Sequence, residues 1–78
     1  MDKATLVRRL DALILTEEAA VPIYLDHIDA VLSWSGFSPA SKARAAETMR
    51  SMAEECVRHR RMLQELKVRA LGRKTDVF

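Results

Sequence analysis

The stretch SWSGFSP, residues 33–39, is the strongest break in the chain and decides the fold. Ser38 followed by Pro39 is typical of a helix start, because the hydroxyl caps free amides and proline fits the first helical position. Gly36 is typical of the end of a preceding helix, and Gly72 of the end of a following one. We therefore predict these elements: a helix over about residues 3–34, a turn at about 35–38, a helix over about 39–71, and a frayed tail at 72–78.

The length of 78 residues fits a single domain, 1–78, with a modest hydrophobic core. The one cysteine, Cys56, excludes an intramolecular disulfide and is typical of a reducing compartment. Arg8, Arg9 and Asp11 interrupt the apolar N-terminal segment, which does not resemble a signal peptide. The sequence has no run of about 18 apolar residues that would predict a membrane span. We expect a cytoplasmic protein with no membrane partner.

Pro22 falls inside the first predicted helix. Proline removes one backbone hydrogen bond, so it predicts a kink or a local opening of the helix. An alternative is that a fresh helix starts at Thr16, with Thr16 as its N-cap. Both alternatives keep the chain all-α.

Each predicted helix carries a wide apolar stripe with the three- and four-residue spacing of a heptad seam. The first seam comprises Leu6, Leu10, Leu13, Glu17, Ala20, Tyr24, His27, Val31 and Trp34, beside a flanking row of Val7, Ile14, Val21 and Ile28. The second seam comprises Ala45, Met49, Met52, Cys56, His59, Leu63, Leu66 and Ala70. Because two helices cannot cover both stripes, we predict an antiparallel two-helix hairpin that self-associates into a four-helix bundle, as a dimer or a higher even-numbered oligomer.

Polar residues stand in these apolar seams. In an antiparallel hairpin, residues lie level when their numbers sum to about 74, which places Glu17 near Glu55 and His59. Glu55 and His59 are four residues apart and share one face of their helix. By the same rule His27 lies level with Glu47. A buried carboxylate must be paired, hydrogen-bonded or bound to a metal, so we interpret these residues as a candidate metal site, with Glu17, Glu55 and His59 facing inward.

Two carboxylates and one imidazole in each hairpin, doubled by dimerisation, form a site rich in carboxylates for two metal ions. Carboxylates suit divalent iron or manganese, and imidazole nitrogen completes the coordination. Helical bundles build such sites from a Glu on one helix and a Glu–His pair on the next. The predicted ligands are Glu17, Glu55, His59, His27 and Glu47. Tyr24 lies two turns beyond Glu17, where its phenol can hydrogen-bond a carboxylate or lend an electron during iron oxidation.

Two segments resemble the ferritin-like superfamily. The stretch EEAAVPIY contains E-x-x-A-x-x-x-Y, from Glu17 to Tyr24, and is similar to the first metal helix of rubrerythrins. The stretch AEECVRHRRMLQEL, residues 53–66, looks like their second metal helix. The short two-helix chain most resembles the encapsulated ferritins, so the resemblance implies a di-iron site between hairpins, ferroxidase-type iron oxidation or storage, and an encapsulating shell as partner.

The chain departs from that family in one spacing. The family pattern is E-x-x-H, whereas Glu55 and His59 form E-x-x-x-H, and Cys56 stands three residues before His59. Three alternatives follow: the helix is locally overwound, the ligand set differs, or the metal site is lost while the fold is kept. Residues 72–78 also do not resemble the C-terminal peptides that dock such proteins as cargo.

The charge is unevenly distributed, although the net charge is only +2. Residues 1–37 hold three basic and six acidic residues, whereas residues 58–74 hold seven basic residues and one acidic residue. Basic residues near a helix end are favoured by the helix dipole. The alternative is a non-catalytic hairpin dimer that acts as an adaptor or regulator and binds an acidic protein or RNA through this stripe. The small net excess argues against nucleic acid.

Overall fold

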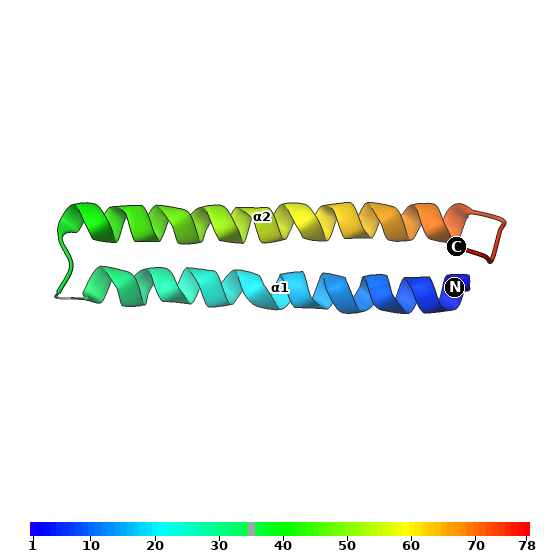
Figure 1. Cartoon of the computed structure of the whole chain (residues 1–78), viewed down its shortest axis with the longest axis horizontal. Coiled ribbons are helices and arrows are strands. Elements are labelled where there is room, and N and C mark those ends of the chain that lie inside the picture. Colours follow the sequence, from blue (N-terminus) through cyan, green and yellow to red (C-terminus); the bar gives the residue numbers. More distant parts are fainter. Residues whose placement is uncertain (35) are drawn as a thin grey trace.

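The computed structural model is an antiparallel hairpin of two long helices, α1 (Lys3–Ser33) and α2 (Pro39–Gly72), and it describes residues 1–34 and 36–78 (Figure 1). The two helices lie side by side, and the hairpin measures 57 × 14 × 14 Å. No strand occurs in the part of the chain that the structure describes. The all-α hairpin and both predicted helices are therefore confirmed. Residue 35, in the predicted turn, lies outside the described residues.

The ends of α1 are formed differently from each other. Asp2 caps its start, because its Oδ1 accepts a hydrogen bond from the Thr5 amide at 2.7 Å. At its other end Trp34 leaves the helical conformation, with φ −69° and ψ 120°. The prediction that Gly36 stops this helix is wrong, since the extended backbone of Trp34 already ends it and no described glycine has a positive φ.

The start of α2 matches the prediction. Ser38 is its N-cap, and the Ser38 hydroxyl accepts a hydrogen bond from the Ser41 amide at 3.2 Å. Pro39 occupies the first helical position, where its missing amide proton is not needed. Lys42 reaches back across the turn and donates from Nζ to the Leu32 carbonyl at 3.2 Å. Capping and this contact together set the point at which the chain reverses.

Pro22 does not interrupt α1. The helix runs unbroken from Lys3 to Ser33 with Pro22 inside it, so the alternative of a fresh helix at Thr16 is wrong. Thr16 is an ordinary interior residue whose hydroxyl donates to the Ala12 carbonyl at 3.0 Å. Pro22 is exposed, so its ring lies on the solvent side of the helix. The packing of α1 on α2 outweighs one lost backbone hydrogen bond.

The contact between the helices joins large residues of α1 to small residues of α2. The buried residues of α1 are Leu10, Ile14, Ile28 and Val31, and those of α2 are Ala46, Ala53, Cys56 and Ala70. Val31 is only 1% exposed and Ala46 only 2%. Small side chains let the helices approach closely, so their atoms pack tightly. This close packing stabilises the hairpin although two helices bury only a modest area of apolar surface.

The contact takes members of both predicted rows of α1. Leu10 and Val31 of the seam and Ile14 and Ile28 of the flanking row are buried, whereas Leu13 and Trp34 of the seam are 50% and 44% exposed. Among the residues that the structure describes, none with a polar or charged side chain is buried. The high free energy of burying a carboxylate agrees with the 25% exposure of the Glu17 side chain.

The C-terminal tail is held against the start of α1. It forms no helix, as predicted, but it is not free of the helices: the Lys3 amide donates to Asp76 Oδ1 at 3.0 Å, and the Phe78 amide donates to the Met1 carbonyl at 2.8 Å. Lys3 Nζ also donates to the Arg73 carbonyl. Figure 1 shows the two termini together at one end of the hairpin. Neither helix combines the length and apolar character that a membrane crossing requires.

Candidate metal centre

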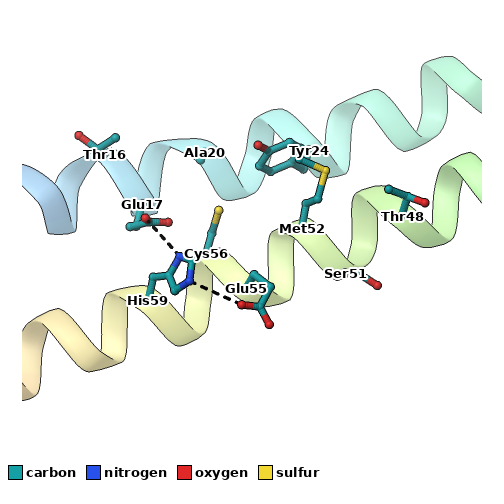
Figure 2. Close-up of a pocket in the computed structure, with 10 residues that line it drawn as sticks. All are labelled: Thr16, Glu17, Ala20, Tyr24, Thr48, Ser51, Met52, Glu55, Cys56 and His59. Atoms are coloured by element: carbon teal, nitrogen blue, oxygen red, sulfur yellow. Dashed lines mark ion pairs between the residues drawn. The ribbon is translucent and has the colours of Figure 1, made fainter.

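A shallow pocket of about 490 Å³ lies halfway along the hairpin, on the side where the predicted seams of α1 and α2 meet (Figure 2). Both helices contribute to it, and polar and apolar side chains alternate along it (Figure 2). Its lining residues are Thr16, Glu17, Ala20, Tyr24, Thr48, Ser51, Met52, Glu55, Cys56 and His59. The structure therefore brings four of the predicted site residues, Glu17, Tyr24, Glu55 and His59, to one place.

His59 lies between two carboxylates. Its Nδ1 is 3.5 Å from Glu17 Oε1, across the two helices, and its Nε2 is 3.5 Å from Glu55 Oε2, one turn earlier on α2 (Figure 2). Both separations exceed the roughly 2.7–2.9 Å of a strong hydrogen bond between charged groups. The imidazole thus links the carboxylates without a tight bond to either.

The three side chains are partly exposed in the single hairpin. The side chain of Glu17 is 25% exposed, that of His59 is 46% exposed, and that of Glu55 is 54% exposed. A single hairpin offers no enclosed space in which a carboxylate would be satisfied. That they face the interior of a bundle of two hairpins stays a prediction.

Arg58 holds Glu55 from the outer side of α2. Two guanidinium nitrogens of Arg58 donate to Glu55 Oε2, Nε at 3.2 Å and Nη2 at 2.6 Å. This hydrogen-bonded pair, then the charge of Arg58, and the nearby His59 hold the pKa of Glu55 below its usual value. Glu55 therefore stays ionised at neutral pH, but Arg58 occupies the oxygen that also faces His59.

Cys56 is a member of the site that the metal-ligand prediction left out. Its side chain points toward α1 beside Glu17, from the turn of α2 between Glu55 and His59 (Figure 2). Burial, followed by a hydrogen bond with Glu17 and the negative charge of Glu17, raises the pKa of the Cys56 thiol. The signal in the sequence was the three-residue spacing between Cys56 and His59, which places both on one face of a helix.

Tyr24 and Met52 lie side by side toward the turn-proximal end of the pocket, which Ser51 and Thr48 also line (Figure 2). Tyr24 is half-buried, one turn beyond Ala20, so its ring covers the gap between the helices while its hydroxyl stays accessible. Met52 is 41% exposed. A thioether and a phenol ring provide a flexible and partly apolar wall on this side of the carboxylates.

His27 and Glu47 are not part of this pocket. His27 is exposed, and its Nδ1 lies 2.7 Å from the Ile23 carbonyl, one turn back on the same helix. That carbonyl satisfies the nitrogen locally, so His27 donates the proton on Nδ1 and can offer only Nε2 to a metal. Glu47 is exposed on the outer side of α2. The structure therefore separates these two predicted ligands from Glu17, Glu55 and His59.

Exposed apolar side chains continue beyond the pocket toward the termini. A second hollow of about 310 Å³ shares Glu17 and His59 with the pocket and is otherwise lined by Leu13, Met62, Leu63 and Leu66. Leu13, Met62 and Leu66 are each 48–50% exposed. We call the surface formed by the two hollows the open face. It consists of a polar cluster with apolar residues on both sides along the hairpin.

One hairpin does not complete a metal site. Across residues 1–34 and 36–78, no group of three or more His, Cys, Asp or Glu side chains is placed to hold a metal ion. The Glu17–His59 and His59–Glu55 contacts supply pairs of donors.

No protein-family model, curated protein or solved structure matches the chain.

Proposed function

We propose that two copies of the hairpin pair through the open face, and that pairing builds a ferritin-like carboxylate–imidazole site for divalent iron or manganese. Iron oxidation or storage is the function that such a site would serve. The observation that carries the proposal is the Glu17–His59–Glu55 cluster, which lies at the middle of the open face with apolar surface on both sides.

The donor atoms fit this class of metal, although one hairpin supplies too few of them. Two copies bring four carboxylates and two imidazoles to one place, and these oxygen-rich ligands suit Fe²⁺ and Mn²⁺. Glu55 must turn one oxygen from Arg58 toward the partner, which is feasible because its side chain is 54% exposed. Glu17 needs no such movement, since it already lies within the pocket.

The exposed apolar surface supports pairing. Leu13, Met52, Met62 and Leu66 are 41–50% exposed on the open face, next to the polar cluster of Glu17, Glu55 and His59. Contiguous apolar patches on small proteins mark surfaces that another chain covers. A 78-residue hairpin with a core of mostly small side chains also gains stability from covering that patch.

The charge distribution favours an antiparallel pair. The half of the hairpin nearer the termini, residues 1–15 and 58–78, holds ten basic and four acidic residues, a balance of +6. The half nearer the turn, residues 16–57, holds three basic and seven acidic residues, a balance of −4. When one hairpin is reversed on the other, each basic half faces an acidic half. The two Glu17–His59 clusters, close to the boundary between the halves, then come together.

Within such a pair the residues of this chain have distinct roles. Glu17 and His59 bind the metal from opposite helices, and Glu55 adds a carboxylate at the rim. Tyr24 lines the same pocket, where its hydroxyl can hydrogen-bond a carboxylate of either copy and hold its orientation. Iron bound at this site would supply the redox chemistry. The apolar wall of Tyr24 and Met52 limits the access of water.

Anaerobic titration with iron(II), followed by elemental analysis and measurement of the mass in solution, tests the proposal. We expect about one iron per chain in an even-numbered oligomer. Glu17→Gln should weaken iron binding at least about 10-fold, because it removes a ligand charge. Glu18→Gln is the matched control, since Glu18 is the exposed neighbour outside the pocket and should bind as the wild type does. A chain that binds neither iron nor manganese would refute the proposal and leave the adaptor function.

A further inference from the structure

We infer that a second copy of the hairpin docks antiparallel on the side of α2 that faces away from the open face, through a stripe of alternating charges. This interface is separate from the pairing that the proposed function needs, and it holds with or without a metal. A chain that pairs through both faces forms an assembly of at least four copies.

The charged stripe follows α2 with the three- and four-residue spacing of a heptad seam. Its members are Arg50, Glu54, Val57, Arg61, Glu65 and Val68. All of them are exposed except Val57, which is half-buried. None of them lines the open face. Arg61 follows His59 by two residues, and each residue of a helix advances by about 100°, so the stripe lies on roughly the opposite side of α2 from the open face.

Two shallow hollows adjoin the charged stripe and share Arg61. One has a volume of about 440 Å³, is lined by both helices, and has the apolar lining residues Val21, Leu25, Ala53 and Val57. The other has a volume of about 340 Å³ and lies along α2 beside Val68. Leu25 is 46% exposed and Val68 is 69% exposed. A second copy on the stripe therefore buries apolar surface in addition to matching charges.

The order of charges along the stripe is self-complementary in the antiparallel sense. When a second α2 is reversed on the first about a two-fold axis next to Val57, residues lie level where their numbers sum to about 115. Glu54 of each copy then meets Arg61 of the other, and Arg50 of each copy meets Glu65 of the other. A parallel pair in register would place like charges opposite each other at all four positions, which is unfavourable. The order of charges therefore selects a second, antiparallel copy as the occupant.

The stripe charges are free for such a partner, whereas Arg58 is not. Arg58 lies close to the proposed axis, but its Nε and Nη2 both donate to Glu55 Oε2, so its charge is balanced within its own chain. Within residues 1–34 and 36–78, the four charged members of the stripe take part in no ion pair. A second copy supplies the opposite charges that these side chains do not find in one hairpin.

Charge reversal tests the interface, with the mass in solution at low salt as the readout. Glu54→Arg should raise the dissociation constant of this interface at least about 10-fold and halve the number of chains in the assembly, because arginine then meets Arg61 of the other copy. Glu54→Arg combined with Arg61→Glu exchanges the two charges and should restore the wild-type mass. Glu54→Arg combined with Arg9→Glu is the matched control, since Arg9 is exposed on α1. It restores the net charge but not the pair, and should stay dissociated.

The Leu13→Gln variant separates this inference from the proposed function. If the open face also pairs, Leu13→Gln and Glu54→Arg each halve the assembly, and the two together leave single chains. If only the stripe pairs, Glu54→Arg alone leaves single chains and Leu13→Gln has no effect, so the inference stands while the proposed pairing fails. An unchanged mass for Glu54→Arg, or a charge exchange that does not restore association, overturns the second interface and leaves the open face as it is.

Discussion

The two apolar surfaces of this hairpin differ in how they treat polar residues. The contact between α1 and α2 buries Leu10, Ile14, Ile28 and Val31 against small residues, and an ion pair between Lys67 and Asp11 at 2.7 Å also joins the two helices. The open face exposes side chains of similar size, but it carries Glu17, Glu55 and His59 at its centre. The first surface therefore maintains the fold of one chain, whereas the second leaves both apolar and charged side chains accessible.

The difference shows why a polar residue in an apolar stripe need not lie in a core. Glu17 belongs by spacing to the seam of Leu10 and Val31, yet these two are buried whereas the Glu17 side chain is 25% exposed. Its exposure avoids the free-energy cost of desolvating a carboxylate inside one hairpin.

The largest effect should come from the contact between α1 and α2. Ile28→Ala, at a residue that is 7% exposed, should lower the free energy of unfolding by about 2–4 kcal/mol, because it removes buried methyl groups and leaves a cavity. Chemical denaturation followed by circular dichroism measures this change. Ile23→Ala is the matched control, since Ile23 lies on the same helix and is 54% exposed.

The Ile23→Ala control also tests whether the open face differs from the rest of the exposed surface of α1. If Ile23→Ala destabilises the protein as much as Ile28→Ala does, the outer side of α1 is buried in an assembly as well, and the open face is not distinctive. A change within about 0.5 kcal/mol for Ile23→Ala agrees with a residue that faces solvent.

A smaller effect on folding, but a clear effect on association, should follow from a change on the open face. Leu13→Gln should raise the dissociation constant of the pair about 10- to 100-fold, because a half-exposed leucine is lost from the interface in both copies. Sedimentation measurements over a range of concentrations give the constant. Leu15→Gln changes a 65% exposed leucine of the same helix outside the two hollows and should associate as the wild type does. Equal effects of the two substitutions would place the interface elsewhere.

The hairpin can be predicted from the sequence because the residues that start a helix act on backbone groups only a few positions away. Ser38 and Pro39 start a helix by capping and by fixed backbone geometry, and both act in the structure as predicted. Gly36 misled the prediction of the helix end, because an extended residue at Trp34 ends a helix without any glycine. Pro22 leaves two alternatives in the sequence, and the structure has the single helix, which packing along α2 supports.

Only part of the site can be predicted from the sequence. The level rule places Glu17 beside Glu55 and His59, and the structure joins them through His59. Periodicity identifies two adjacent apolar rows on α1 but not how each residue packs, and the structure buries members of both rows while the Glu17 side chain stays 25% exposed. His27 shares the row of Glu17 but lies nearer the turn, where the Ile23 carbonyl satisfies it locally. That Glu17, Glu55 and His59 face the interior of a two-hairpin bundle stays a prediction.

The mass of the wild-type chain in solution, measured over a range of dilutions, tests most directly whether a second copy covers the open face. We expect a species of twice the 8.8 kDa chain mass, or a higher even multiple, which dissociates on dilution and is stabilised by iron(II). A chain that stays at 8.8 kDa at every concentration, helical and unaffected by iron(II), would show that no second copy covers the open face.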